Sequence, residues 1–194
     1  MLEGKRGSYK PSIQSVFILD KAGEPLFARY YNIRRTKDDS VLLAAFLSAI
    51  EIFTTHSLEG QLTDLGLGDQ RYFFGRSDSG FMFVASMTSA EQLFIDPSKS
   101  KIMQLFLRNT AIAFELLDYI SKNSKIRISS LVSNFGTTID SLILEATLEI
   151  MKIEGWDEES YVPSEFEMGK GLDQEEFQLL KELINVKTGD LFKN

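Results

Sequence analysis

Residues 39 to 55 constrain the fold of this chain most, because they predict a helix that is apolar around most of its circumference. At about 100° per residue, one face carries five apolar side chains: Leu42, Phe46, Ala49, Ile50 and Phe53. The remaining small or polar strip is narrow: Ser40, Ala44, Ser48, Glu51 and Thr55. An ordinary amphipathic helix buries a stripe of roughly 100°. We therefore expect the apolar face to pack on a sheet and its two flanks to need a further cover.

These flanks provide candidate partner-binding residues, two on each side of the helix: Val41 with Ile52, and Leu43 with Leu47. Three elements could pack on these flanks: a neighbouring helix, the chain's own C-terminal segment or a partner protein. The sequence does not decide among these three alternatives. The loop before the helix adds two cationic candidates, Arg34 and Arg35. They would contact an acidic partner or a lipid head group, although a solvated loop explains them as well.

The segments around this helix predict one α+β domain over residues 13–154. Five segments have strand patterns, with tight turns after the first and the fourth: 13–19, 25–31, 61–67, 71–76 and 81–87. Helices are expected over 98–121 and from Thr137 or Thr138 to about 152, with 126–135 ambiguous and ended by Gly136. Residues 1–12 form a polar lead. Residues 155–194 form an acidic linker and, from 173 to 186, an amphipathic helix with four apolar positions: Phe177, Leu180, Leu183 and Ile184.

Composition and charge exclude several classes of function. A formal net charge of −7 disfavours nucleic-acid binding, because a phosphate backbone needs a basic protein face. The chain has no cysteine and a single histidine, His56, so metal sites and nucleophilic triads lack their usual residues. The glycine-containing stretch 66–70 lacks the ending of a phosphate-binding loop, and the stretch 75–80 is followed by a strand pattern instead of a helix. We expect a non-enzymatic protein without cofactor or metal.

No run of about 20 residues is apolar enough for a transmembrane helix, and the N-terminus lacks the pattern of a signal peptide. We therefore expect a cytoplasmic protein without a transmembrane segment. Peripheral association with a membrane remains open, because a small basic patch is enough for it.

The predicted order of strand, strand, helix, three strands, helix, helix resembles the longin domain. Four stretches resemble longin-type small chains of vesicle coat adaptors, such as the zeta chain of the COPI coat: Ser15–Tyr31, Arg71–Val84, Phe114–Tyr119, and Leu131–Phe135 followed by Ile143–Glu145. The resemblance implies a longin/profilin-like fold. In this fold, helices flank a five-stranded antiparallel sheet, and here a C-terminal helical extension would follow.

The resemblance also implies a function in vesicle trafficking or small-GTPase regulation. Such a module would pair with another longin or roadblock domain, in a copy of itself or in a different chain, and would present a platform to a small GTPase. Coat subunit and GTPase regulator both remain open. The alternative from another class is a small-molecule-binding sensor of roadblock/profilin-like fold, with its pocket between sheet and helices.

Overall fold

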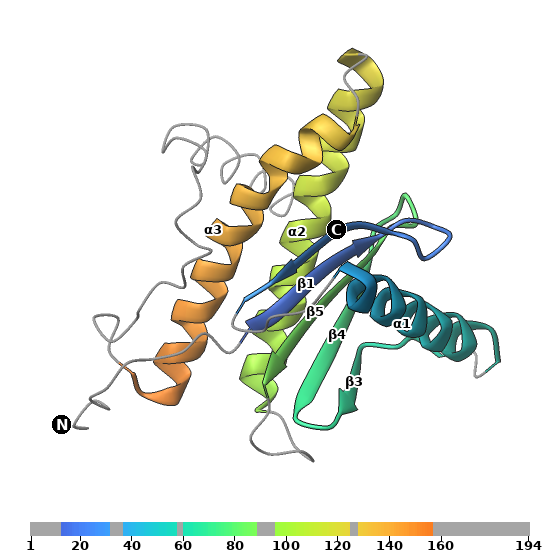
Figure 1. The fold of residues 1–194 in the computed structure, drawn as a ribbon. Helices are drawn as coiled ribbons and strands as arrows, with labels where there is room; N and C mark the ends of the chain where they lie inside the picture. Colours follow the sequence, from blue (N-terminus) through green and yellow to red (C-terminus); the bar gives the residue numbers. More distant parts are fainter. Residues whose placement is uncertain (1–12, 32–36, 58–59, 89–95, 125–127, 157–194) are drawn as a thin grey trace, which may run out of the picture.

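The computed structural model describes residues 13–31, 37–57, 60–88, 96–124 and 128–156 (Figure 1). Its strands are β1 (Ile13–Leu19), β2 (Pro25–Tyr30), β3 (Asp64–Leu67), β4 (Gln70–Arg76) and β5 (Met82–Thr88). Its helices are α1 (Lys37–Ser57), α2 (Pro97–Ser124) and α3 (Ile128–Glu154). The predicted α+β class and the order of elements are confirmed. The predicted N-terminal lead and nearly all of the C-terminal linker and helix lie outside the described residues.

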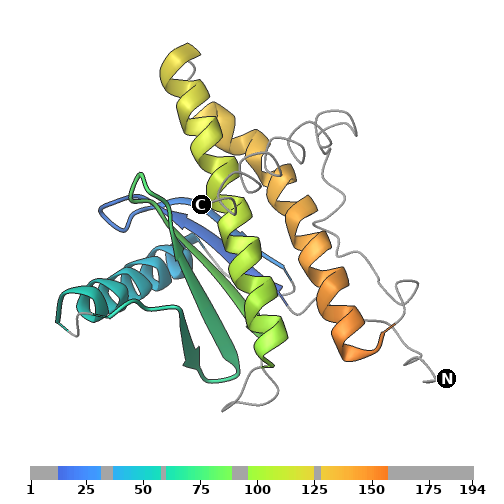
Figure 2. The same cartoon turned by 180° about the vertical axis from the view of Figure 1, so that it is seen from behind.

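The five strands form one antiparallel sheet in the order β2-β1-β5-β4-β3. Helices α2 and α3 lie side by side against one face of this sheet, and α1 is the described helix on the other face (Figures 1 and 2). Strand β1 lies inside the sheet, between β2 and β5, and every one of its residues is buried. This arrangement explains its almost continuous apolar run, since both of its faces meet covered layers.

Two hairpin turns form as the sequence predicts. Asp20 accepts hydrogen bonds on its carboxylate from the backbone N–H of Ala22 and Glu24, at 2.9 and 2.8 Å. Gly23 closes the same turn with a φ of 85°, in the left-handed region that glycine adopts without steric cost. Gly80, with a φ of 87°, closes the turn between β4 and β5. These turns set the register of the strands on either side.

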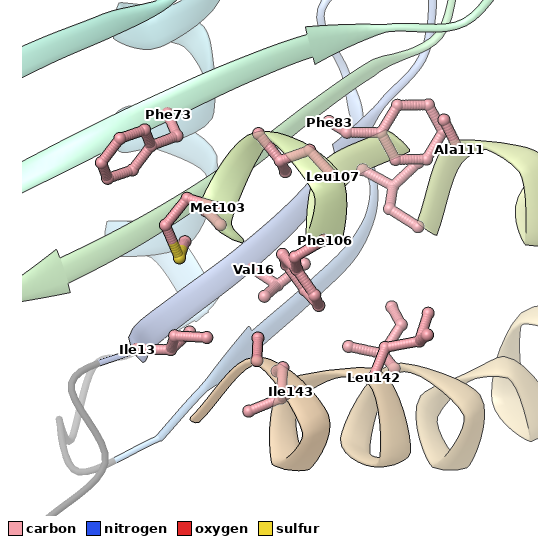
Figure 3. Packing of buried hydrophobic residues seen from close by; sticks show 14 of the residues in the cluster. Ile13, Val16, Phe73, Phe83, Met103, Phe106, Leu107, Ala111, Leu142 and Ile143 are labelled. Atoms are coloured by element: carbon pink, nitrogen blue, oxygen red, sulfur yellow. The ribbon is translucent and has the colours of Figure 1, made fainter. Parts of the chain in front are cut away.

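The main hydrophobic core lies between the sheet and the pair α2 and α3 (Figure 3). Phe114 of α2 is at its centre and makes edge-to-face contacts with Phe81, Phe83 and Phe135. Counted over the described residues, this core contains 20 buried residues, whereas the cluster beneath α1 contains eight. Most of the apolar burial therefore comes from the α2 and α3 side, and α1 contributes a smaller second layer.

Helix α3 corrects the sequence prediction at its N-terminal end. The sequence predicts that Gly136 ends one segment and that Thr137 or Thr138 caps the next, but α3 runs without a break through all three. A glycine inside a helix costs roughly 0.5–1 kcal/mol relative to alanine. Here Gly136 makes room for Arg29 of β2, whose Nη1 would lie 2.6 Å from a Cβ at this position. A tertiary contact thus overrides the local signal for a helix end.

The same arginine belongs to a polar group that fixes α3 to β2. Arg29 forms an ion pair with Asp140 of α3 at 2.9 Å, and the Tyr31 hydroxyl donates a hydrogen bond to Asp140 at 2.8 Å. The Asp140 carboxylate is buried, so these partners compensate for its removal from water. This group therefore sets how α3 lies across the edge of the sheet.

Candidate docking surface on helix α1

Helix α1 faces the sheet with its small and polar strip, opposite to the prediction. Over residues 41–57 of α1, the buried side chains are Ala44, Leu47, Ser48 and Glu51. Of the five residues predicted to pack on the sheet, Leu42, Phe46, Ala49 and Phe53 are exposed, and Ile50 is half-buried. The expectation that this apolar face packs on the sheet is therefore wrong.

Close approach to the sheet explains this orientation. A Cβ added at Gly23 would lie 2.8 Å from the Ser48 Cβ, so the helix nearly touches the β1–β2 turn there. Ala44 is fully buried one turn earlier, where a larger side chain would push the helix away. Leu47 is the fully buried large apolar residue of α1, within the cluster of Phe17, Phe74 and Val84. Small residues at these positions let α1 lie close to the strands.

Glu51 is the charged residue in this strip, and Arg76 at the end of β4 neutralises it. The Arg76 guanidinium donates two hydrogen bonds to the carboxylate, one of them from Nε to Oε1 at 2.8 Å. The Thr55 hydroxyl donates a further one at 3.2 Å. The hydrogen bond from Arg76 lowers the pKa of Glu51 more than burial raises it, and the Arg76 charge and the Thr55 hydroxyl lower it further. The buried carboxylate therefore stays ionised and ties α1 to β4.

The opposite side of α1 is an apolar surface open to solvent. We define the outer face of α1 by its seven exposed apolar residues: Val41, Leu42, Ala45, Phe46, Ala49, Ile52 and Phe53. Leu42 is 71% exposed and Phe53 is 58% exposed, while Val41, Phe46 and Ile52 are each exposed by 44–46%. Leu42, Phe46, Ala49 and Phe53 recur at helical spacing, so they form one continuous stripe.

No charge interrupts the outer face between residues 41 and 55. The acidic residue in this stretch, Glu51, is buried on the sheet side. His56 lies at the C-terminal end of α1, with its Nδ1 3.1 Å from the Ile52 carbonyl oxygen. Contiguous exposed apolar surface of this kind marks sites where proteins bind other molecules. The outer face is therefore the candidate functional site.

The six residues predicted to bind a partner do not lie together on one surface. Val41 and Ile52 lie on the outer face, where a partner would reach them. Leu47 is fully buried against the sheet, and Leu43 is partly buried in the same cluster. Arg34 and Arg35 lie outside the described residues. The two flanks of the predicted face thus have different surroundings, one in the core and one in solvent.

The sequence prediction missed the centre of the outer face, formed by Leu42, Phe46 and Phe53. One signal was available, because Ala44, Ser48 and Glu51 recur at intervals of four and three residues and make a narrow small stripe. Such a stripe fits the close packing of a helix on a sheet. The size of the residues, read together with their polarity, indicates which side of α1 faces inward.

Other features of the described residues give no competing site. Four further large apolar side chains are exposed on α2 and α3: Leu105, Tyr119, Leu144 and Ile153. Within the parts of the chain that the structure describes, His, Asp and Glu side chains form no group of three or more that could hold a metal ion. Likewise, none of the described helices combines the length and the apolar character needed to cross a membrane.

No protein-family model matches this chain, and a search of curated proteins also finds no match.

Proposed function

We propose that this chain is a non-enzymatic protein-interaction module of the longin type, which docks a second folded domain on the outer face of α1. The second domain is another longin or roadblock domain, in a copy of this chain or in a different protein. The exposure of the uncharged apolar outer face supports this proposal. Among the described residues, the outer face brings five exposed large apolar side chains together on one helix.

The number of apolar side chains on the outer face determines how much free energy their burial would contribute to binding. Full burial of one large apolar side chain contributes about 1.5–3 kcal/mol. Five such side chains, each already partly covered, would together contribute on the order of 5 kcal/mol. Association costs at least about 4 kcal/mol in lost freedom of motion. The outer face would therefore anchor a docking contact, and surrounding polar contacts would supply the rest of the affinity.

The resemblance to longin domains supports the wider setting of the proposal. The paired domains would present a platform to a small GTPase during vesicle trafficking. We also propose that the protein works in the cytoplasm and reaches membranes peripherally, through its partners.

Site-directed photo-crosslinking tests the docking contact. A photoreactive residue replaces Phe46 on the outer face or, as the matched control, Leu105, which is 55% exposed on α2 across the sheet. We expect crosslinks to a longin or roadblock domain from position 46 and none from position 105. Sedimentation of the purified full chain at increasing concentration then determines whether that domain is a second copy. Identical crosslinking from both positions would refute the docking function.

A substitution provides the second arm of this test. Phe46→Asp places a charge in the centre of the outer face and should reduce association with the crosslinked domain by at least about tenfold. Leu105→Asp introduces the same charge at a similar exposure and should leave the association unchanged. Equal affinities for Phe46→Asp and the unaltered chain would contradict the proposal.

A further inference from the structure

We propose that the partner docked on α1 contributes an extended segment, which pairs with the edge strand β2 and lies beside α1. This inference rests on the proposed docking function, because the segment would cover Val41, Ala45 and Ile52, which belong to the outer face of α1. It names the part of the partner that makes the contact and the pattern of its side chains. The backbone of β2 and the surfaces on its two faces support it.

Strand β2 forms one edge of the sheet, because it pairs with β1 and with no other described strand. The Tyr31 N–H donates a hydrogen bond to the Gln14 carbonyl oxygen at 2.7 Å. Hydrogen-bonded and non-hydrogen-bonded pairs alternate along an antiparallel ladder, so Ala28 and Tyr30 belong to non-hydrogen-bonded pairs with β1. Their backbone N–H and C=O groups therefore point outward, with the spacing that another extended chain would match.

The α1 side of this edge is open. Ala28 of β2 lies opposite Phe17 of β1, and the two side chains point to the same face of the sheet. Phe17 is fully buried in the cluster beneath α1, whereas Ala28 is exposed. Helix α1 thus covers β1 at this level and leaves room beside β2, where the side chain of an added strand would lie.

The side of α1 that is turned toward β2 carries exposed apolar residues. Ser48 marks this side, because it lies against Gly23 in the turn between β1 and β2. Val41, Ala45 and Ile52 lie at positions −7, −3 and +4 from Ser48, so they share its side of the helix. All three are exposed. Of the described strands, β2 also has the most extensive contact with α1. A strand added to β2 would therefore bury apolar surface of α1.

The opposite face of the same edge is polar. Arg29 of β2 points to this face and pairs with Asp140 of α3 at 2.9 Å. Ile139, which precedes Asp140, is buried in the core, so Ser141, turned by about 100° the other way, points beyond the edge. Successive side chains of a strand point to opposite faces. The segment that fits here has apolar residues at every second position, facing α1, and polar residues between them, facing α3.

The other edge strand, β3, suits such a segment less well. It has four residues, against six in β2, and contains Gly66, and a glycine inside a strand weakens it. The Phe74 N–H donates to the Thr63 carbonyl oxygen at 2.9 Å, so by the same alternation the backbone groups of Gly66 point outward. On the α1 side of β3, Leu43 and Leu65 pack against the cluster beneath α1. The space beside β3 is therefore already occupied by the chain itself.

Panning of short random peptides displayed on phage against the immobilised full chain tests this inference. We expect the selected peptides to carry apolar residues at every second position. Each is then synthesised in two N-methylated forms, with the methyl groups on alternate backbone nitrogens. One form should bind at least about tenfold more weakly, because its methyl groups replace the N–H groups that face β2, and the other should bind unchanged. Apolar residues at spacings of three and four, or equal binding of the two forms, would overturn the inference.

Two proline substitutions in the full chain locate the edge that binds the peptide. Ala28→Pro removes an outward N–H of β2 and leaves the bonds to β1 in place, so it should lower the affinity at least about tenfold. Gly66→Pro is the matched control on β3, where no atom lies within 4 Å of the missing Cβ, and it should leave the affinity unchanged. Loss of binding in Gly66→Pro but not in Ala28→Pro would assign the segment to β3 and refute this proposal.

Urea denaturation checks that both proline variants are folded, and the N-methylated peptides decide the question if Ala28→Pro is not. The docking function is decided separately by Phe46→Asp and its crosslinked domain. If Phe46→Asp loses this domain while the peptides bind Ala28→Pro as well as the natural chain, the docking function stands and strand addition at β2 is wrong. If Phe46→Asp binds the domain as well as the natural chain, the docking function fails, and this inference fails with it.

Discussion

Ser48 of α1 lies directly over Gly23 of the β1–β2 turn, with its Cβ 2.8 Å from the point where a side chain on residue 23 would begin. The hydroxyl oxygen of Ser48 lies closer still to this point. Gly23 therefore has two functions, because it closes the hairpin with a positive φ and lets α1 approach the sheet. The orientation of α1, and with it the exposure of the outer face, depends on this contact.

Replacing Gly23 should destabilise the fold, because the residue is needed both for the positive φ and for the close approach of α1. Gly23→Ala should lower the free energy of unfolding by about 2–4 kcal/mol, because the new methyl group would clash with Ser48 and the backbone would be strained. Gly68→Ala is the matched control, since Gly68 also has a positive φ, of 62°, but has nothing near its missing Cβ. It should cost only about 1–2 kcal/mol. Urea denaturation of both variants measures the difference, and equal losses would show that Ser48 does not crowd residue 23.

Two leucines on α1 test which side of the helix faces the sheet. Leu47→Ala should cost about 2–5 kcal/mol, because it opens a cavity in the cluster beneath α1. Leu42→Ala removes the same atoms from a side chain that is mostly in solvent and should cost less than about 0.5 kcal/mol. Chemical denaturation compares the two variants. The orientation of α1 would be wrong if Leu42→Ala proved the more destabilising.

The ion pair between Glu51 and Arg76 should make stability depend on pH in the acid range. The pKa of Glu51 is lowered from its ordinary value of about 4.5, mainly by the hydrogen bond from Arg76, so the folded protein favours the ionised carboxylate. Its contribution is complete above that ordinary value and is lost as the pH falls through the lowered pKa. Glu51→Gln should therefore be less stable than the natural chain by about 1–2 kcal/mol at pH 7, and the gap should close in acid.

Denaturation at pH 7, 5 and 3.5 measures this gap. Glu149→Gln is a suitable control, because Glu149 pairs with Lys152 on the exposed side of α3 and both side chains are more than half exposed. It should change stability by less than about 0.5 kcal/mol at every pH. A gap between Glu51→Gln and the natural chain that stayed constant down to pH 3.5 would disprove the coupling.

Replacing Gly136 by alanine should change the free energy of unfolding in opposite directions in the presence and in the absence of Arg29. In the natural chain Gly136→Ala should destabilise by about 1–2 kcal/mol, because the methyl group would displace the Arg29 guanidinium from Asp140. In the Arg29→Ala background the same change should stabilise by about 0.5–1 kcal/mol, since alanine favours a helix interior. Thermal and chemical unfolding are measured for the natural chain, the two single variants and the double variant, which together form a double-mutant cycle. The explanation for Gly136 would fail if the sign were the same in both backgrounds.

Most of the fold could be predicted because its signals are local. The apolar run of β1 and the turns at Gly23 and Gly80 are each determined by a few adjacent residues. The first strand, for example, is predicted with the same limits that the structure shows. The order of elements then restricts the chain to a few possible topologies. Side-chain pattern and turn chemistry thus account for the sheet.

The two failures come from contacts between segments far apart in the chain. The prediction for α1 assumed that the most apolar face of a helix is the buried one. The close contact between Ser48 and Gly23 of the β1–β2 turn instead places the small strip of α1 on the sheet. Gly136 has the local signal of a helix end, but the contact with Arg29 lies more than 100 positions earlier in the chain. Neither relationship can be seen in a window of a few residues.

The position of β1 between β2 and β5 has a consequence for the synthesis of the chain. Ser15 of β1 bonds through its hydroxyl to Ser86 of β5 at 2.6 Å, across 71 positions. At about 5–20 residues per second, a ribosome needs roughly 4–14 s to pass from one serine to the other. During those seconds β1 has only β2 to pair with, and a two-stranded hairpin is marginal in water. One edge of the apolar strand β1 therefore has no strand partner until β5 leaves the exit tunnel. During this interval the nascent chain would bind a chaperone or misfold.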